Sequence, residues 1–201
     1  MIESIDNGIQ IAVLGICVIA AILKAARYRS RSWTLLAFFY GSWLLGDIYW
    51  TVCLFFYNKT PEISVVSDLS WYASYIFLYL LLRHTSPPEK LEGKKIIPWL
   101  GPVFTLGMAL FFMRRGEILS NLIYAGLMGL LLYAAIHRLI ERRNRFLPAL
   151  ILIFCLLEYA LWTASCFWND ELLLHPDYCF DFLLTVSFPF FLPAVRKEVA
   201  A

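Results

Sequence analysis

The sequence predicts an all-α, polytopic membrane protein, a bundle of seven transmembrane helices formed by a single domain over residues 1–201. The first observation is composition: 61% of the 201 residues are hydrophobic and 16% are charged, against about 45–50% and about 25% in soluble domains. The second is that the apolar residues form long blocks, each near the roughly 20 residues that cross a bilayer. The third is that Lys and Arg gather in every second loop between these blocks.

Each apolar block has boundary signals of its own. The segment Met1–Asn7 is acidic and lacks the basic region of a cleavable signal peptide, so the first block is expected to be a span. Ser64 or Ser67 can cap the third span, and Pro148 and Pro176 suit the starts of the sixth and seventh. The predicted spans are 8–26, 33–57, 66–83, 96–113, 118–137, 146–168 and 177–195.

Proline also interrupts two of the predicted spans. A proline inside a helix lacks the N–H that its turn needs, and its ring clashes with the preceding turn. Kinks or a broken last turn are therefore expected at Pro98 and Pro102 in the fourth span, and at Pro189 and Pro193 in the seventh.

The basic residues predict the orientation. Fourteen of the seventeen Lys and Arg follow the first, third, fifth and seventh spans: Lys24, Arg27, Arg29, Arg31, Arg83, Lys90, Lys94, Lys95, Arg138, Arg142, Arg143, Arg145, Arg196 and Lys197. The opposite loops hold Lys59, Arg114 and Arg115. Because basic loops stay in the cytoplasm, the N-terminus is expected outside and the C-terminus inside. The cluster Arg138–Arg145 is expected to anchor at anionic lipid head groups and not to bind nucleic acid.

A faint internal repeat accompanies this topology. An offset of 111 residues maps Asp47 onto Glu158, and it also maps Arg27 onto Arg138. It predicts a 3+1+3 plan with the fourth span as connector, and parallel repeats of this kind occur among transporters. The alternative is chance, because hairpins of equal length produce matched basic loops by themselves.

Four acidic residues are predicted at membrane depth without Lys or Arg beside them: Asp47, Asp68, Glu158 and Asp181. Asp47, within "GDIYW", and Glu158 lie near the middle of their spans, where helix capping does not explain them. Asp68 begins a helix, where a negative charge meets the positive end of the dipole, and Asp181 lies one turn deeper than such a start. For Asp47 and Glu158 two readings stay open: a hydrogen-bonded carboxyl that joins helices, or a functional group, the default for intramembrane acids.

Aromatic residues share helical faces with these acids. They are Trp43 and Trp50 beside Asp47, Trp71 and Tyr75 beside Asp68, and Trp162 beside Glu158. An acidic cavity with aromatic walls suits an organic cation, or a polarised ester or ether; the alternative for the aromatic residues is an interfacial belt. We expect Asp47 to face Glu158 across such a cavity, open to the outer side, with the two carboxyls not both ionised.

The remaining reactive residues predict no cofactor and no metal site. Cys166 and Cys179 flank the last outer loop, where a disulfide is geometrically possible in an oxidising compartment and two free thiols are the alternative. His84, His137 and His175 lie in loops or at span ends and do not form a ligand set. The seventh span has no lysine for a retinal Schiff base, and no phosphate-binding glycine pattern is present.

The segment Gly46–Arg83 resembles the GD-x-x-W…P…S-x-(A/S)-D…Y pattern of seven-helix membrane sensor domains in bacterial signalling proteins. The match rests on Gly46, Asp47, Trp50, Pro61, Ser67, Asp68 and Tyr75. In that family the domain precedes a cyclase, phosphodiesterase or kinase module. The resemblance implies a membrane sensor of a small ligand and, since no such module follows the seventh span in this sequence, a separate signalling protein as partner.

A second segment, Asn121–Arg138 followed by the sixth span, is similar to lysoplasmalogenase-like membrane proteins, which carry a GD in an early helix and an acid in a late one. That resemblance implies hydrolysis of an ether lipid by paired acids, with Asp47 at the early position. Glu158 stands where an Asp is expected, and the chain is one helix short of that family.

Three functions therefore remain open. The preferred one is a sensor or receptor-like module that binds a ligand from the outer side or from the lipid, because no nucleophile, metal site or histidine base reaches the expected cavity. An acid-pair lipid hydrolase and a small-solute or proton-coupled transporter are the alternatives, so enzyme activity is undecided. The expected partners are the bilayer and a small ligand or lipid, in the bacterial cytoplasmic membrane.

Overall fold

The computed structural model describes residues 2–57, 65–85, 96–115, 118–141, 145–167 and 176–200, and these ranges contain helices and no strand. The helices are α1 (Ile2–Tyr28), α2 (Arg31–Tyr57), α3 (Val65–His84), α4 (Leu100–Phe112), α5 (Ile118–Ile140), α6 (Phe146–Phe167), α7 (Pro176–Ser187) and α8 (Phe191–Ala200). Two 3₁₀ turns, η1 (Ile97–Trp99) and η2 (Phe188–Phe190), precede α4 and join α7 to α8. The all-α prediction is confirmed.

Both predicted proline interruptions are present as 3₁₀ turns. Pro98 lies in η1 and Pro189 lies in η2. Pro102 and Pro193 each lie in the first turn of the helix that follows, where a missing N–H leaves no intrahelical bond unmade. In each pair, the first proline lies in the 3₁₀ turn and the second lies in the first turn of the α-helix that follows.

Five helical segments are long and apolar enough to cross a membrane: Asp6–Tyr28, Val65–His84, Ile118–Ile140, Phe146–Phe167 and Pro176–Val199. These segments identify a polytopic helical membrane protein. The predicted second and fourth spans differ from them. The 27 residues of α2 exceed the length of a span, but tryptophan, tyrosine and Asp47 reduce its apolar character. The fourth helical segment, Ile97–Phe112, is apolar but short.

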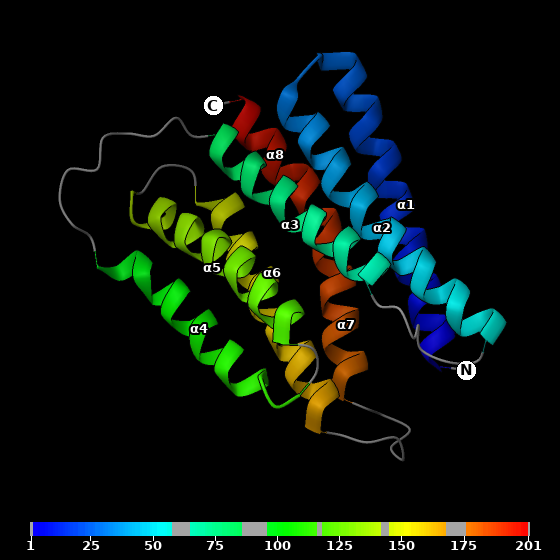
Figure 1. Cartoon of the computed structure of the whole chain (residues 1–201). Helices are drawn as coiled ribbons and strands as arrows, with labels where there is room; N and C mark the ends of the chain where they lie inside the picture. Colours follow the sequence, from blue (N-terminus) through cyan, green and yellow to red (C-terminus); the bar gives the residue numbers. More distant parts are fainter. Residues whose placement is uncertain are drawn as a thin grey trace.

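Among the described helices, six form a closed ring, α4 lies outside it, and α8 continues α7 through η2 and packs on α6 and α2. Around the ring, α1 packs on α2, α2 on α3, α3 on α5, α5 on α6, α6 on α7, and α7 returns to α1. Outside this ring, α4 packs along α5 at the edge of the bundle (Figure 1). The ring thus consists of two groups of three consecutive helices, and the helix between them is peripheral.

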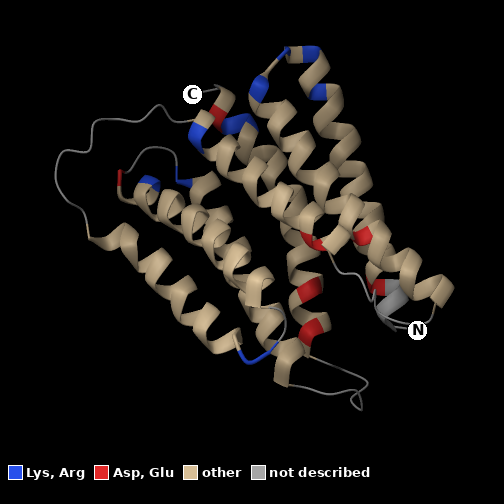
Figure 2. Ribbon diagram, viewed as in Figure 1, with Lys and Arg blue, Asp and Glu red and all other residues tan. Residues whose placement is uncertain are grey.

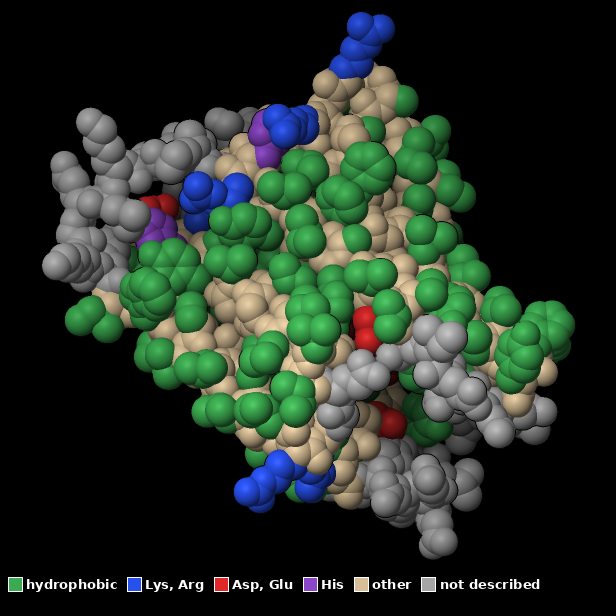
Figure 3. All heavy atoms as spheres, viewed as in Figure 1, with side chains coloured by type: hydrophobic (Ala, Val, Ile, Leu, Met, Phe, Trp, Pro, Cys, Tyr) green, Lys and Arg blue, Asp and Glu red, His purple; other side chains and the backbone are tan. Residues whose placement is uncertain are grey.

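Charge separates along the axis of the bundle. Most Lys and Arg gather at the end that carries the C-terminus, while most of the acidic residues drawn lie at mid-height and toward the opposite end (Figure 2). Apolar side chains cover the middle of the visible surface, and acidic atoms reach it in the lower half (Figure 3). A belt of this kind is the surface that a lipid bilayer solvates.

Aromatic rings fill the middle of the ring of helices. Phe39 of α2 contacts Phe154 of α6, with ring centroids 5.8 Å apart, and Phe188 of η2, at 6.0 Å. Trp43 packs on Phe154 at 5.2 Å and on Phe188 at 5.3 Å. Because α2, α6 and η2 meet through these rings, the two halves of the bundle share one core.

Candidate functional site

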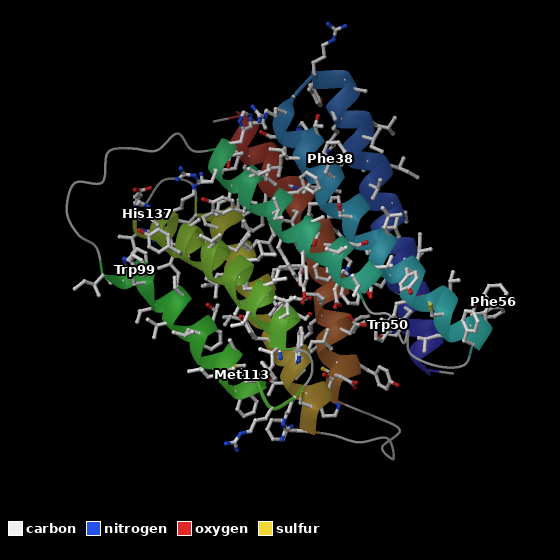
Figure 4. All side chains as sticks on the ribbon, viewed as in Figure 1. Phe38, Trp50, Phe56, Trp99, Met113 and His137 are labelled. Carbon is white, nitrogen blue, oxygen red and sulfur yellow. The ribbon has the colours of Figure 1, made fainter. Side chains whose placement is uncertain are left out.

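The "GDIYW" segment of α2 is built around one side chain of α3, Trp71. The indole Nε1 of Trp71 donates to Oδ1 of Asp47 at 3.2 Å. A Cβ atom at Gly46 would come within 2.6 Å of that nitrogen, so only glycine allows the approach. Trp50 packs on the Trp71 ring, with centroids 6.0 Å apart; Figure 4 shows Trp50 toward one end of α2. The glycine, the aspartate and the tryptophan of the motif all contact Trp71.

The next turn of α3 holds the second acid. Tyr75, one turn after Trp71 on the same helix, donates its hydroxyl to Oε2 of Glu158 at 2.8 Å. Trp71 and Tyr75 therefore bring the carboxyl of α2 and the carboxyl of α6 to one face of α3. Asp47 and Glu158 are 7% and 8% exposed, and they lie within electrostatic range of each other. The structure thus brings the two central candidates together through α3.

Each of these carboxyls has one buried oxygen that accepts no hydrogen bond from a described residue. The atoms are Oδ2 of Asp47 and Oε1 of Glu158. The buried hydroxyl of Tyr124 on α5, which lies beside Glu158, also has no hydrogen bond of normal geometry within the described residues. Buried polar atoms are normally paired, and an unpaired one costs about 1–3 kcal/mol. These three atoms mark a polar point at which water or a ligand would be stabilised.

A chain of aromatic rings surrounds the two acids. Trp43 lies 6.5 Å from Trp71 and 5.6 Å from Tyr75, and Tyr75 lies 5.7 Å from Tyr124 between ring centroids. Trp162 of α6 continues the chain at 4.9 Å from Tyr124. The predicted aromatic residues are thus grouped around the acids, although Trp162 packs on the α5 side of Glu158.

Asp181 lies between this centre and the N-terminal end of the bundle. Its Oδ1 accepts a hydrogen bond from Gln10 of α1 at 3.0 Å, and its carboxyl also interacts with that of Asp6. Asp181 lies within electrostatic range of both Asp47 and Glu158. No pattern in the sequence indicated Gln10, because one glutamine in an apolar helix does not repeat at helical spacing with other polar residues.

Asp68 makes a contact with α5. Its Oδ2 accepts a hydrogen bond from Ser120 of α5 at 3.3 Å, and the Tyr72 hydroxyl donates to the Ser120 carbonyl at 3.2 Å. Asp68 therefore connects α3 to the start of α5 in the manner of a structural residue.

Arg138 differs from its expected role as a lipid-facing anchor. It is 7% exposed and donates to the Leu82 carbonyl at 3.1 Å and to Thr85 Oγ1 at 2.9 Å. Its second nitrogen forms an ion pair with Glu198 of α8 at 3.2 Å. The charge pattern alone did not separate a buried arginine from its exposed neighbours, because the distinction depends on which helices cover it.

The five cysteines are free thiols. The bond between Cys166 and Cys179 that the sequence allowed is therefore not formed in the structure. No group of three His, Cys, Asp or Glu side chains that could hold a metal ion occurs among the residues described. Acids and aromatic rings are the chemistry that this centre offers.

The fold and this centre define a class: a polytopic helical membrane protein with a buried acidic and aromatic core. No protein family, curated protein or solved structure matches the chain. The resemblances to sensor domains and to lysoplasmalogenase-like proteins therefore stay predictions.

Proposed function

We propose that the protein is a small membrane sensor or receptor-like module whose ligand is an organic cation or protonatable amine bound at Asp47 and Glu158. The observation that carries the proposal is the pair of buried, unpartnered oxygens, Oδ2 of Asp47 and Oε1 of Glu158. A bound quaternary ammonium group would place a positive charge beside both oxygens, and a protonated amine would also supply the donors that they lack. Either group would also offset the cost of two neighbouring carboxyls in a low-dielectric interior.

The aromatic rings around the acids support a cation over a neutral ligand. The faces of tryptophan and tyrosine carry negative charge density and attract an alkylammonium group. Trp43, Trp71 and Tyr75 form a continuous set of rings beside the carboxyls. Because the other oxygen of each acid is already held by α3, ligand binding would change the contacts of α3, α2 and α6 together.

The proposed setting is a seven-span protein of the bacterial cytoplasmic membrane with its N-terminus outside. In this arrangement α2 and the shorter η1–α4 segment also lie in the bilayer. Support comes from the gathering of Lys and Arg at the C-terminal end of the bundle (Figure 2). Asp6 and Asp181 would then lie on the outer side of the acid pair, and a separate signalling protein would read the cytoplasmic face.

The test compares choline with 3,3-dimethylbutan-1-ol, its uncharged carbon isostere, on the purified protein in detergent. Thermal unfolding is followed by tryptophan fluorescence, because a ligand that binds only the folded state raises the transition temperature. We expect choline to stabilise the wild type and the alcohol to have no effect. An equal shift with both compounds, or no shift with choline at millimolar concentration, would contradict a cation site.

Matched variants place the site. Asp47→Asn and Glu158→Gln are expected to remove the choline shift and to leave folding intact, since each amide keeps a carbonyl oxygen for Trp71 or Tyr75. Asp68→Asn is the control, because the Asp68 carboxyl accepts a hydrogen bond from Ser120 of α5, and it should keep the full shift. If Asp68→Asn alone removes the shift, the site is elsewhere. Release of aldehyde from a vinyl-ether lysolipid by the wild type would instead favour the acid-pair hydrolase.

A second candidate, transport of a small solute or of protons, draws on the ring of helices. Two groups of three consecutive helices surround the acids while α4 lies outside, as a 3+1+3 repeat requires. Asp47 and Glu158 come from the second helix of each group. Uptake of labelled choline into vesicles containing the protein, dependent on a pH gradient, would distinguish a transporter from a sensor.

A further inference from the structure

A column of polar side chains runs along α7 and α1, from the end of the bundle that carries the N-terminus toward the acid pair of the proposed cation site. On α7, Asp181 and Thr185 are one turn apart on one face. On α1, Asp6 and Gln10 have the same spacing, and α1 packs against α7. Acidic residues along α7 lie toward the N-terminal end of the bundle (Figure 2). The two helices therefore bring polar groups together inside an otherwise apolar bundle.

Gln10 and Asp6 both contact the carboxyl of Asp181. The amide Nε2 of Gln10, a residue that is 5% exposed, donates to Oδ1 of Asp181 at 3.0 Å. The carboxyl of Asp6 is a second hydrogen-bonding partner of Asp181. An ionised carboxylate only accepts, so a hydrogen bond between two carboxyls requires a proton on one of them. This geometry therefore favours one proton held between Asp6 and Asp181.

The charged groups around this carboxyl pair are acidic as well. Asp177 of α7 lies within electrostatic range of Asp181, and so do Asp47 of α2 and Glu158 of α6. Together with Asp6 of α1, these acids face Asp181 from α1, α2, α6 and α7. Because like charges at such distances repel, a proton held by the pair relieves repulsion on every side.

Two threonine hydroxyls continue the column to the acid pair. Thr185 is 3% exposed, and its Oγ1 forms no hydrogen bond with a described residue. The same is true of the buried Oγ1 of Thr51, one turn from Asp47 on α2. A threonine inside a helix can instead bond the carbonyl one turn earlier, as Thr163 does to Tyr159 at 2.6 Å. A hydroxyl that is not used in this way can both accept and donate a proton.

Aromatic rings fill the bundle on the other side of the acid pair, toward the basic end. Four fully buried rings lie there: Phe39, Phe154, Phe188 and Phe191. Phe191 lies 5.3 Å from Phe39 and 5.8 Å from Phe154 between ring centroids. Phenylalanine rings have no polar atom that could carry a proton. Within the described residues, the polar column therefore reaches the acid pair from the N-terminal end of the bundle.

We propose that Asp6 and Asp181 form a proton-binding site, and that a relay through Thr185 connects the acid pair with the solution at the N-terminal end of the bundle. Only O–H bonds form and break in this relay. The hydroxyl of Thr185 takes up a proton that leaves the acid pair and gives its own to Asp181, and the carboxyl pair releases one to water. The relay goes beyond the cation site and does not depend on which ligand the acid pair binds.

The first test is infrared spectroscopy of the purified protein in detergent at neutral pH. The carbonyl stretch of a protonated carboxyl is separate from the bands of a carboxylate. We expect Asp181→Asn to remove one protonated-carboxyl band, because Asp6 is then left without an acid to share its proton. The control is Glu141→Gln, at an acid that pairs with His137 at 3.1 Å, and it should leave these bands unchanged. An unchanged spectrum of Asp181→Asn would overturn the proton-binding site.

A second measurement tests the relay itself. On transfer to heavy water, the protonated-carboxyl band that remains in Asp181→Asn should shift several-fold more slowly than in the wild type, and Thr185→Val should slow it likewise. Thr163→Val is the matched control, because its hydroxyl is bonded within its own helix, and it should exchange at the wild-type rate.

Equal exchange rates in all these proteins, or no protonated-carboxyl band left in Asp181→Asn, would overturn the relay. Neither measurement uses choline, so failure of the cation site and failure of the relay are distinguishable. Unchanged thermal unfolding confirms that each variant folds.

Discussion

Gly46 and Asp47 are neighbours in sequence because a single contact needs both of them. The aspartate supplies the acceptor for the Trp71 indole at 3.2 Å, and the glycine supplies the space through which that indole reaches it. A larger residue before the aspartate would displace the ring and leave the carboxyl without its donor. The motif is therefore explained by packing between α2 and α3, whichever ligand the second carboxyl oxygen binds.

Gly46→Ala should destabilise the protein by about 1–3 kcal/mol, because its Cβ overlaps Trp71 and the hydrogen bond to Asp47 is strained or lost. The free energy of unfolding in mixed micelles measures the effect, and a shift in tryptophan emission reports displacement of Trp71. Gly126→Ala is the control: its Cβ meets nothing within 4 Å, so it should be neutral or slightly stabilising. Equal effects of the two variants would disprove the explanation.

Arg138→Met should be strongly destabilising, by about 3–5 kcal/mol, since it leaves the Glu198 carboxylate buried without its partner. Glu198→Met should have a similar effect, and the double variant should recover part of the loss because no isolated charge remains. Unfolding free energies of the four proteins form a double-mutant cycle. Additive losses would show that the ion pair at 3.2 Å contributes nothing of its own. Arg83→Met, at an exposed arginine, is the control.

At the scale of the element, the C-terminal segment is one membrane span divided by a 3₁₀ turn. Pro189 and Pro193 remove two N–H groups from it, and η2 tightens the backbone between α7 and α8. The Tyr40 hydroxyl of α2 donates to the Phe188 carbonyl at 2.7 Å. A side chain from a neighbouring helix thus holds the irregular turn, as lipid cannot.

Tyr40→Phe should lower the free energy of unfolding by about 0.5–1.5 kcal/mol. The lower part of this range is expected, because the Phe188 carbonyl also accepts from the Phe191 N–H. Hydrogen exchange at the η2 amides should increase in the same variant. The exposed Tyr57 provides the matched control, and a Tyr57→Phe change that destabilises equally would argue against a specific role for the Tyr40 hydroxyl.

At the scale of the whole molecule, the basic residues and the contacts between helices are arranged along different directions. The basic residues follow the axis of the bundle, whereas the contacts around the ring depend on which helices are adjacent. The peripheral position of α4 leaves the acids inside a ring of six helices. Asp181 and Gln10 lie between these acids and the end of the bundle that carries the N-terminus.

A reporter attached to the C-terminus should be active only in its cytoplasmic form, with alkaline phosphatase inactive and green fluorescent protein fluorescent. The physical reason is the excess of Lys and Arg at that end, which resists translocation. Reporters after α2 and after α6 should give the opposite result. Alkaline phosphatase activity at the C-terminus would reverse the proposed orientation.

Periodicity, composition and proline alone determined the helices of this protein. The apolar blocks, Pro98 and Pro189 indicated where helices run and where they tighten, because hydrogen bonding within a helix and the transfer of apolar side chains out of water are local properties. The same reasoning overestimated how apolar the second span is and how long the fourth helix is. In α2, tryptophan and tyrosine count as hydrophobic, yet each carries a polar group that needs a partner.

Only the tertiary structure decided how the acids are used. Asp47 and Glu158 were both conspicuous in the sequence, but it left open that Trp71 and Tyr75 of α3 would each hold one oxygen and leave the other unpaired. It also left Arg138 among the anchors. The reason is that a hydrogen bond between helices depends on their order around the ring and on their rotation. The residues that form these two hydrogen bonds are 24 and 83 positions apart in the chain. The order and the rotation of their helices are therefore determined only when all the helices pack.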